Sequence, residues 1–415
     1  MRKQLHSIAA ILLSVLFFLM GNGLLGTLTP VRAHLLGFSD IIVGVIGSAY
    51  YAGFVIGCFS GPRLLARVGY SRTFAVAASV AAISPLLQSL SANEWVWVAV
   101  RGLFGVAAAN LYMVIESWLN DRATNETRGR IFSTYMTVTY LAMIAGQWLY
   151  STGRASSYSL FSQSAIIYAL CLIPVGLTRL PPPKPGPIPM LRPLRMFRLS
   201  PVGVAGCTAV GFANAAIWAL APIYAHDHHL TRSLLAAFMS AFTLGGALIQ
   251  VPLGRLSDRM DRRILIAGVC VAAAAAGVAL YLYGGQSRTL ALLLVAVFGV
   301  TALPLYGLSV AHANDRLPRE MFVEASATLL LINAVASVAG PILGAFVMAR
   351  EGSAALFLYT AAVHVCLFAF TIMRLFMSPA PREETRDHFE ALPQQGSPAS
   401  TELDPRGNQS EPAKA

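Results

Sequence analysis

The sequence is poor in charged side chains and is dominated by apolar ones. Lys, Arg, Asp and Glu make up 12% of the 415 residues, whereas 56% are hydrophobic. A typical soluble domain has about 25% charged residues. The apolar residues come in repeated runs of about twenty, the length of helix that spans a bilayer. The composition therefore excludes an ordinary soluble protein and predicts an all-α membrane protein with many transmembrane helices.

Signatures of catalysis and metal binding are also missing. The five cysteines lie inside apolar runs without close spacing, so neither a disulfide framework nor a metal site is indicated. No phosphate-cradling Gly-rich loop, His-Glu-x-x-His pair or Gly-x-Ser-x-Gly elbow occurs. His226, His228 and His229 cluster with Asp227 and could bind a metal, but a solvated loop is the favoured interpretation. We therefore expect no enzyme, no cofactor and no ATP-driven transport by this chain.

Apolar runs broken by Pro, Gly or charge predict twelve transmembrane helices. An even number of helices places both termini on the same side of the membrane. The predicted helices cover residues 7–29, 40–61, 73–91, 95–118, 131–150, 159–179, 201–224, 232–254, 264–284, 288–312, 323–348 and 354–376.

Basic residues are distributed unevenly over the predicted loops. With cytoplasmic termini, the inner segments hold twenty Lys and Arg residues before the tail is counted, and the outer segments hold five. Because cytoplasmic loops of membrane proteins are enriched in basic residues, we expect both termini in the cytoplasm and the chain in the bacterial inner membrane. The net charge of +11 then reflects topology and membrane lipid, and no nucleic-acid partner is expected.

Two segments differ in composition from the apolar runs. Residues 180–189 are rich in proline and cannot continue a helix. The last 38 or so residues are rich in Pro, Glu, Ser and Gln and have little to bury. These features predict an N-terminal six-helix bundle (1–180), a cytoplasmic basic linker (181–199), a C-terminal six-helix bundle (200–377) and a disordered cytoplasmic tail (378–415). The basic residues of the linker could also contact anionic lipid.

Residues of the first half recur in the second half at a nearly fixed offset. Parallel repeats of this kind are related by an axis along the membrane normal, which predicts a solute site at the midplane between the halves. Pairs at an offset of 192 are Asn22 with Asn214, Pro30 with Pro222, Gly53 with Gly245 and Arg67 with Arg259; pairs at 194 are Phe104-Gly105-Val106 with Phe298-Gly299-Val300, Asn120-Asp121-Arg122 with Asn314-Asp315-Arg316, and Gly146 with Gly340.

The stretch Gly254–Arg263 holds six charges in ten residues, and the sequence predicts a short cationic hairpin here. It is similar to the motif Gly-x-Leu-x-Asp-Arg-x-Gly-Arg-Arg, with Asp261 where the motif often has Gly. Arg101–Gly105 resembles an Arg-x-x-x-Gly motif of a fourth helix, and Thr127–Arg130 resembles a basic turn before a fifth. With these motifs the sequence resembles the major facilitator superfamily over residues 7–376, in a bacterial permease branch. The resemblance implies twelve helices in two pseudo-symmetric bundles.

The resemblance also implies gating residues, and the sequence departs from the family at two places. The first-half counterpart of the hairpin has Ala66 instead of the acid, which puts a first-half latch in doubt. Gly146 is followed by Gln147 rather than Pro, which lowers the support for a drug/proton antiporter. Asp258 is expected to contact the inner end of the fifth helix when the inner side is closed. The predicted gating residues are Arg67, Arg72, Arg128, Arg130, Gly254, Asp258, Arg259 and Arg263.

Two charges fall inside predicted membrane helices, where a charge costs about 2.5–3.5 kcal/mol. Arg101 and Glu116 share one face of the fourth helix with Gly105, Ala108 and Tyr112, because these residues are spaced by four or three. The guanidinium could bind an anionic group or couple to gate movement, and the carboxyl could take a proton or pair with an arginine. Alternatively, both side chains reach the headgroups at the membrane interfaces.

Amides and an aromatic side chain complete the candidate site. Asn22 and Asn214 are repeat partners, and Trp218 follows Asn214 by one helical turn. Such groups suit a polar organic solute, although membrane asparagines also bond neighbouring helices. The predicted solute-binding residues are Asn22, Arg101, Tyr112, Glu116, Asn214 and Trp218, with Asn110, Gln147 and Asn333 as weaker candidates.

These observations favour a secondary or facilitative transporter of a small polar or amphipathic organic solute that works by alternating access. Protons are a possible coupling ion, and we expect a monomer. One alternative is multidrug/proton efflux, which would require a wide, aromatic-rich cavity. A less favoured alternative is a membrane-embedded sensor that reuses the fold and docks a partner on its tail. Substrate identity and transport direction stay open.

Overall fold

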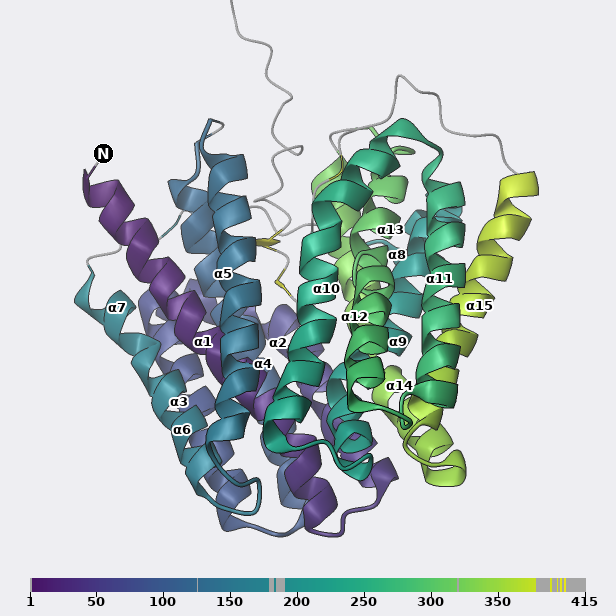
Figure 1. Cartoon of the computed structure of the whole chain (residues 1–415). Helices are drawn as coiled ribbons and strands as arrows, with labels where there is room; N and C mark the ends of the chain where they lie inside the picture. The colour runs from purple at the N-terminus through teal and green to yellow at the C-terminus, as the bar shows by residue number, and fades with distance from the viewer. Residues whose placement is uncertain are drawn as a thin grey trace, which may run out of the picture. The chain divides into compact units, whose positions relative to one another are not determined.

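The computed structural model describes residues 2–124, 126–178, 183, 191–318 and 321–377, and positions 389, 394, 396, 397, 399 and 400 near the C-terminus. Throughout these residues the regular structure is helical (Figure 1). The α-helices are α1 (Arg2–Leu35), α2 (Asp40–Val68), α3 (Tyr70–Leu90), α4 (Glu94–Arg122), α5 (Arg128–Leu149), α6 (Ser159–Leu170), α7 (Leu172–Leu177), α8 (Pro193–Leu199), α9 (Pro201–Asp227), α10 (Arg232–Arg259), α11 (Arg262–Tyr283), α12 (Arg288–Ala302), α13 (Leu305–Asn314), α14 (Phe322–Glu351) and α15 (Ala355–Met377).

The helices form two compact units. Unit 1 contains α1, most of α2, and α3 to α7. Unit 2 contains Ser39–Ser48 and the helices from α8 to α15. Among the described C-terminal positions, Phe389 and Gln394 belong to unit 2, and those from Gly396 onward belong to unit 1.

Most of the helices are apolar enough to cross a membrane. Eleven helical segments in the described part of the chain have the required length and composition, with α6 and α7 counted as one span and α12 and α13 as another. The remaining helix of the twelve predicted is α5, which has 22 residues but is more polar. The hydroxyls of Ser133, Thr134, Thr137 and Thr139 bond to carbonyls one turn earlier, at 2.8 to 2.9 Å. These bonds satisfy the hydroxyl groups within the helix itself.

In unit 1, α1 and α3 each pack mainly against two other helices. Helix α1 packs along α5 and also contacts α6, while α3 packs against α4 and α6 (Figure 1). The approach of α1 to α5 depends on glycine. A Cβ added at Gly146 would collide with the backbone of Met20, so only a residue without a side chain fits at this crossing. Small residues allow such close helix packing in membranes, where burial of apolar side chains gives little driving force between helices.

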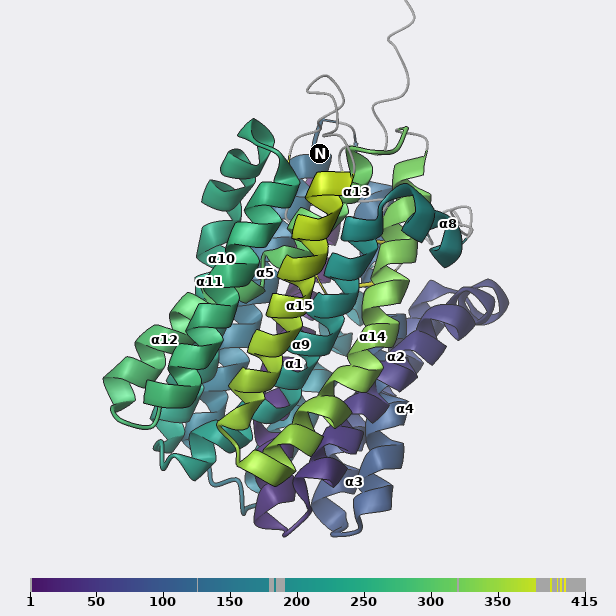
Figure 2. The ribbon, with the colours of Figure 1, turned by 90° about the vertical axis from the view of Figure 1, so that its right-hand side faces the viewer.

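Unit 2 repeats this arrangement with equivalent helices. Helix α9 packs along α14 and α15, α10 packs against α12, and α11 packs against α15 (Figure 2). A Cβ at Gly340 would collide with the carbonyl oxygen of Phe212, which is the counterpart of the Gly146 contact with Met20. The offsets of these residues, 194 for the glycines and 192 for their partners, are those of the sequence repeat.

A second pair of contacts confirms that the repeat is structural. In unit 1, Gly105 lies against the backbone of Tyr50, whose ring lies 5.8 Å from that of Phe104. In unit 2, Gly299 lies against the backbone of Phe242, and the rings of Phe242 and Phe298 lie 5.9 Å apart. Corresponding residues therefore make corresponding contacts in the two units.

Proline interrupts the tenth predicted helix. The sequence predicts one helix over 288–312, but α12 ends at Ala302 and α13 begins at Leu305. Pro304 has no N–H to donate to a preceding carbonyl and disfavours helical continuation. The last carbonyls of α12 are therefore available to side chains. The counterpart of Pro304 in unit 1, at the offset of 194, is Asn110, which lies within the unbroken helix α4.

The charged stretch Gly254–Arg263 is more helical than the predicted hairpin. Helix α10 continues to Arg259, and α11 begins at Arg262, so only Met260 and Asp261 form the turn. Asp261 has φ −62° and its side chain accepts from the N–H of Arg263 as the N-cap of α11. In the corresponding turn of unit 1, Gly69 has φ +85° and makes no side-chain cap. Asp replaces Gly here because the second turn needs no positive φ.

The two predicted polar segments are only partly described. Within the predicted linker, positions 181, 182 and 184–190 lie outside the described residues, and Pro193 to Leu199 form α8 with Pro193 in its first turn. Arg192 and Arg195 lie 3.7 and 4.0 Å from the carboxylate of Glu324 on α14. Arg192 and Arg195 of the linker thus have a protein partner. Most of the predicted tail, 378–415, lies outside the described residues.

Candidate functional site

The buried face of α4 carries the two charges predicted from the sequence. The guanidinium carbon of Arg101 lies 5.0 Å from the centre of the Tyr50 ring and 5.1 Å from that of Phe104. Its Nε is buried without a hydrogen-bond partner, and no carboxylate of the described part of the chain pairs with Arg101. An arginine that lies beside two aromatic rings and has an unused Nε–H can receive an anionic or hydrogen-bond-accepting group.

Glu116 lies four turns further along α4 and is completely buried, with 0% exposure. Its Oε1 accepts a hydrogen bond of 3.1 Å from the hydroxyl of Tyr135 on α5. Its Oε2 accepts two bonds from Ser397, one of 2.8 Å from the backbone N–H and one of 2.6 Å from the hydroxyl. A carboxyl in such a place can hold a donor group or exchange a proton.

Tyr112 and Asn22 lie in the same unit but differ in their surroundings. Tyr112 is buried and packs edge-on against Phe18, with ring centres 5.1 Å apart. Asn22 on α1 is half-buried, and its Oδ1 accepts a hydrogen bond of 3.1 Å from the hydroxyl of Tyr168 on α6. Asn22 therefore joins two helices through one carbonyl oxygen, and its amide donors have no partner within unit 1 among the described residues.

In unit 2 the centre of the candidate site is Asn214 on α9, with 2% exposure. Its Nδ2 lies 3.4 Å from the carbonyl oxygen of Ala302, at the interrupted end of α12, and 3.1 Å from Oε1 of Gln394. Its Oδ1 is buried and has no hydrogen-bond partner among the described residues. An unused buried acceptor is costly unless a ligand or water meets it.

Trp218 lies one turn after Asn214 and is half-buried. Its ring packs edge-on against Phe242, with ring centres 5.1 Å apart. Asn333 on α14 is buried and donates a hydrogen bond of 3.2 Å to the backbone carbonyl of Gln394. Asn214 and Asn333 therefore approach the same residue from two helices. The sequence ranked Asn214 as a stronger candidate and Asn333 as a weaker one.

One protein-family model matches the chain twice. The model of the Major Facilitator Superfamily matches residues 11–208 and again residues 203–407. The chain belongs to this superfamily. The resemblance and the all-α fold predicted from the sequence are thereby confirmed, and the chain is an integral membrane protein of a transporter family.

Individual relatives are distant but cover most of the chain. An uncharacterised transporter of this superfamily from Escherichia fergusonii, YcaD, is 26% identical over 373 residues, which is 88% of this chain and 94% of the relative. One from Yersinia enterocolitica is 24% identical over 355 residues, which is 85% of this chain and 92% of the relative. These bacterial relatives support a location in the inner membrane.

Solved structures confirm the fold. The crystal structure of the nucleoside transporter NupG matches 91% of this chain and 100% of its own with a TM-score of 0.73 and 16% identity. A D-xylose–proton symporter matches 91% of this chain and 98% of its own with a TM-score of 0.68 and 15% identity. At these identities the likeness shows the superfamily fold alone.

The predicted gating residues of this superfamily member fall into exposed and buried groups. Arg67, Arg72, Arg130 and Arg259 are exposed, whereas Arg128 is buried. In the second hairpin, Gly254 is buried and Asp258 is half-buried. Oδ1 of Asp258 accepts bonds from Arg262 at 3.3 Å and from the backbone N–H of Phe389 at 2.8 Å. Its expected contact with the end of α5 stays a prediction.

Two arginines of the second hairpin are held in a buried charge network. Arg262 donates to Asp315 at 2.7 Å and to the hydroxyl of Ser257 at 2.7 Å, and the Arg262 and Asp315 side chains are only 1% and 2% exposed. Arg263 pairs with Asp261 at 2.8 Å. Burial raises the pKa of the Asp261 carboxyl, but the hydrogen bonds and charge of Arg263 outweigh burial and hold its pKa below the ordinary value of 3.8.

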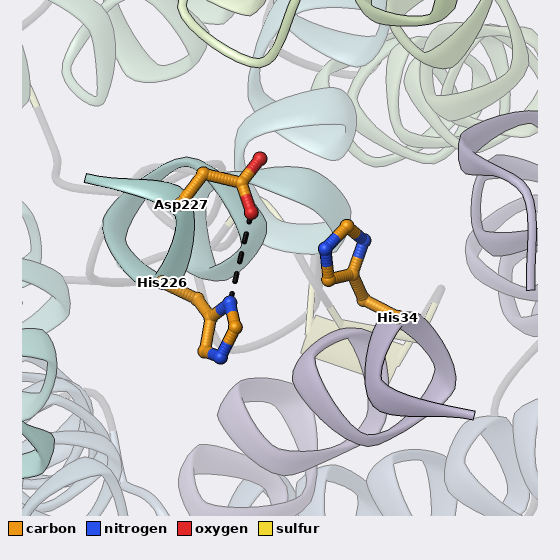
Figure 3. Close-up of side chains that lie close together, drawn as sticks. All are labelled: His34, His226 and Asp227. Carbon is orange, nitrogen blue, oxygen red and sulfur yellow. Dashed lines mark ion pairs between the residues drawn. The ribbon is translucent and has the colours of Figure 1, made fainter. Parts of the chain in front are cut away.

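The histidine cluster lies at the end of α9. His226 forms an ion pair with Asp227, with 3.6 Å between Nδ1 and the carboxylate (Figure 3). His228 directs Nδ1 to the carbonyl oxygen of Tyr224 at 2.9 Å, and its ring lies 4.1 Å from the Tyr224 ring. Within unit 2, two members of the predicted cluster therefore have local protein partners.

The sequence identified several of these residues and missed others. Asp315 was visible in the repeated Asn-Asp-Arg triplet, but nothing in the sequence pairs it with Arg262. Tyr135 lies on another helix from Glu116, and no spacing rule connects them. The C-terminal residues Gln394 and Ser397 carried no signal, because their segment has the composition of a disordered tail.

Proposed function

We propose that this chain is a secondary transporter that moves a small polar organic solute across the membrane by alternating access. The observation that carries the proposal is the buried Asn214, whose Oδ1 has no partner while its Nδ2 binds a carboxamide oxygen of the described chain. A membrane protein does not gain stability from such an acceptor. An unpaired acceptor is useful where a hydrogen-bonding solute enters and leaves.

Arg101 refines the chemistry of this solute. Its guanidinium lies close to the Tyr50 and Phe104 rings, and no acidic side chain of the described residues neutralises it. An anionic or strongly accepting group on the solute would supply the missing partner. Asn22, Tyr112 and Trp218 are proposed as further contacts that orient a compact organic molecule.

Glu116 is the proposed point of coupling to protons. Its carboxyl accepts hydrogen bonds from the hydroxyls of Tyr135 and Ser397, and no basic residue of the described part of the chain pairs with it. Binding of one proton would neutralise the buried carboxylate and change its hydrogen bonds, and release of the proton would restore the charge. The proposal is therefore single-proton coupling, with uncoupled facilitated diffusion as the outcome if Glu116 does not titrate.

Gating is proposed to rest mainly on the second hairpin. There Gly254 and Arg263 are buried and Asp258 bonds to the buried Arg262, whereas Arg67 and Arg72 of the first hairpin are exposed and that hairpin lacks the acid. Arg128, Arg130 and Arg259 are proposed to act with them at the cytoplasmic side, on which both termini would lie.

The test is a panel of nucleosides, sugars, amino acids and carboxylates, read as thermal stabilisation of the purified protein. We expect a hit that stabilises the wild type and the Arg350→Ala control but not Arg101→Ala. Arg350 is a matched control because it also lies over an aromatic ring, 4.1 Å from the centre of Phe346, but is exposed. The hit is then followed as uptake into proteoliposomes with and without a pH gradient.

Two outcomes would count against the proposal. If a hit stabilises Arg101→Ala as well as the wild type, Arg101 is not a binding residue. If a stabilising solute is not taken up by proteoliposomes under either condition, the protein binds that solute without transporting it. Uptake that is unaffected by Glu116→Gln and by the pH gradient would remove proton coupling alone.

A further inference from the structure

The short helix α8 of unit 2 leaves one of its sides uncovered. Leu194 is 81% exposed and Phe197 is 49% exposed, and Arg198 is exposed beside them. Because an α-helix has 3.6 residues per turn, Phe197 and Arg198, which follow Leu194 by three and four residues, lie on the same side as Leu194. Met196 points to the opposite side and is buried, with 2% exposure. Helix α8 therefore packs on the protein through one side and presents two apolar side chains and an arginine on the other.

Helix α8 lies where two membrane-spanning helices begin. Only Ser200 separates it from α9, and Arg192 and Arg195 approach Glu324 in the first turn of α14. Figure 2 shows α8 beside this end of α14. Both α9 and α14 have the length and composition of membrane spans. Because the ends of such helices lie in the headgroup region of the bilayer, α8 lies at the depth of the lipid headgroups.

The segment around α8 carries more positive charge than its protein partners balance. Residues 192–198 include three arginines and no acidic residue. The carboxylate of Glu324 is the partner of both Arg192 and Arg195, so it balances one of their two charges. The exposed Arg198 has no carboxylate within ion-pair distance among the residues that the structure describes. Two positive charges are therefore in excess here, and a phosphate group is a partner that guanidinium groups bind with two parallel hydrogen bonds.

The apolar side chains decide which kind of phosphate fits this surface. A soluble anion would pair with the arginines but would leave Leu194 and Phe197 in water, where exposed apolar area is unfavourable. The surface of an anionic bilayer satisfies both kinds of group. Its acyl chains cover the apolar side chains, while the stem of Arg198 lies along them and the guanidinium stays among the phosphates. The chemistry of this face of α8 therefore matches a phospholipid.

We propose that Leu194, Phe197 and Arg198 form a binding surface for anionic phospholipid, with acyl chains against the two apolar side chains and the phosphate against the guanidinium. The bound lipid holds the start of α9 at a fixed depth in the membrane, because only Ser200 separates the two helices. None of these residues belongs to the proposed solute site or to the proposed gate. The lipid surface therefore goes beyond the proposed function and does not depend on it.

The first test asks whether acyl chains cover the apolar side chains. The full-length protein is placed in nanodiscs of phosphatidylglycerol and phosphatidylcholine, with Phe197 replaced by the photo-crosslinking residue benzoylphenylalanine. After illumination, the crosslinked peptides are identified by mass spectrometry. We expect lipid adducts at position 197, and the same result when Leu194 is replaced instead, because both side chains lie on the uncovered side of α8.

A buried neighbour supplies the control for crosslinking. Benzoylphenylalanine in place of Met196 lies on the opposite side of the same helix and should give at least about fivefold less lipid adduct. Crosslinks from positions 194 and 197 to another copy of the chain would identify a protein interface instead of a lipid surface. A lipid yield no higher than that from position 196 would show that acyl chains do not reach this face. Either result would overturn the proposal.

The second test measures the contribution of charge. Lipid binding to the full-length protein in a neutral detergent is measured by native mass spectrometry, with phosphatidylglycerol or phosphatidylcholine of the same acyl chains as the probe. Arg198→Ala should weaken phosphatidylglycerol binding about fivefold and leave phosphatidylcholine binding unchanged, because one basic residue contributes about this factor at an anionic lipid surface. Arg255→Ala is the matched control, since Arg255 is also exposed and lies at the same end of unit 2, on α10. An equal loss in both variants would show a general effect of net charge and refute the proposal.

A third measurement separates a lipid from a soluble anion. Leu194→Ser with Phe197→Ser should weaken the binding of both lipids by at least about tenfold, because the acyl chains lose their apolar contacts. Glycerol phosphate, which carries the phosphate without acyl chains, should not displace bound phosphatidylglycerol. Unchanged lipid binding in the double variant, or displacement by glycerol phosphate, would contradict lipid binding and identify a site for a soluble anion. None of these measurements reads solute uptake, so their failure leaves the transporter assignment intact.

Discussion

The buried pair of Arg262 and Asp315 offers a decisive test of how unit 2 is stabilised. The perturbation is Asp315→Ala, which leaves the guanidinium of Arg262 in place but removes its shortest contact, of 2.7 Å. Both side chains are at most 2% exposed, so water does not compensate for the loss. Arg262 keeps Ser257 and the half-buried Asp258 as acceptors.

The magnitude follows from that burial. Breaking a buried ion pair by removing one partner costs about 3–5 kcal/mol. Because two acceptors remain, we expect the free energy of unfolding to fall by about 3 kcal/mol, at the lower end of that range. Replacing both charges, as Arg262→Met with Asp315→Leu, should recover much of the loss, since the desolvation of two charges disappears together with their attraction.

The repeat supplies a matched control. Asp121 is the counterpart of Asp315 at the offset of 194, but its side chain is 31% exposed and lies 3.4 Å from the adjacent Arg122. Exposed pairs contribute about 0–1 kcal/mol, so Asp121→Ala should have a small effect. The free energy of unfolding is measured by titration with a denaturing detergent in mixed micelles, followed by tryptophan fluorescence. A loss for Asp315→Ala no larger than that for Asp121→Ala would refute the reasoning.

Two further predictions concern the turns before α3 and α11. Gly69→Ala should lower the free energy of unfolding by about 1–3 kcal/mol, because φ +85° with ψ 164° is a region used almost only by glycine. Gly268→Ala, at an exposed helical position with nothing near its Cβ, should instead raise stability by about 0.5–1 kcal/mol in the same titration; equal effects at both sites would contradict this argument. The lowered pKa of Asp261 means that the unfolded state binds the proton more tightly, so its contribution is present above the ordinary value of 3.8 and is lost as the pH falls through the folded pKa. The acid limb of stability against pH should therefore flatten in Asp261→Asn, and an unchanged limb would show that Asp261 does not titrate in this way.

The fold was predictable in its main features because membrane helices have a strong local signal. Runs of about twenty apolar residues and the bias of basic residues need no knowledge of tertiary contacts. The same holds for the repeat, whose glycine positions later proved to be the points of closest helix approach, as at Gly105 and Gly299. The break at Pro304 and the extension of α10 to Arg259 were not predicted, because helix boundaries depend on capping and on neighbouring groups.

The candidate site was predictable as a set of residues but not as a set of contacts. Arg101 and Glu116 stand out in the sequence because charges are costly in apolar helices. The sequence does not say that Arg101 lies against the Tyr50 and Phe104 rings, nor that Tyr135 donates to Glu116. Both facts depend on which helices pack side by side, and that is decided by the whole unit.

By itself, then, the amino-acid sequence determined the superfamily, the order of the long helices, the internal repeat and the positions of the unusual polar residues. Only the tertiary structure decided which partners these residues have: Asp315 for Arg262, the interrupted end of α12 for Asn214, and Ser397 for Glu116. The physical reason is range. Apolar length and periodicity are properties of neighbouring residues, whereas some hydrogen bonds of the candidate site join residues far apart in the sequence, such as Glu116 and Ser397 with a separation of 281.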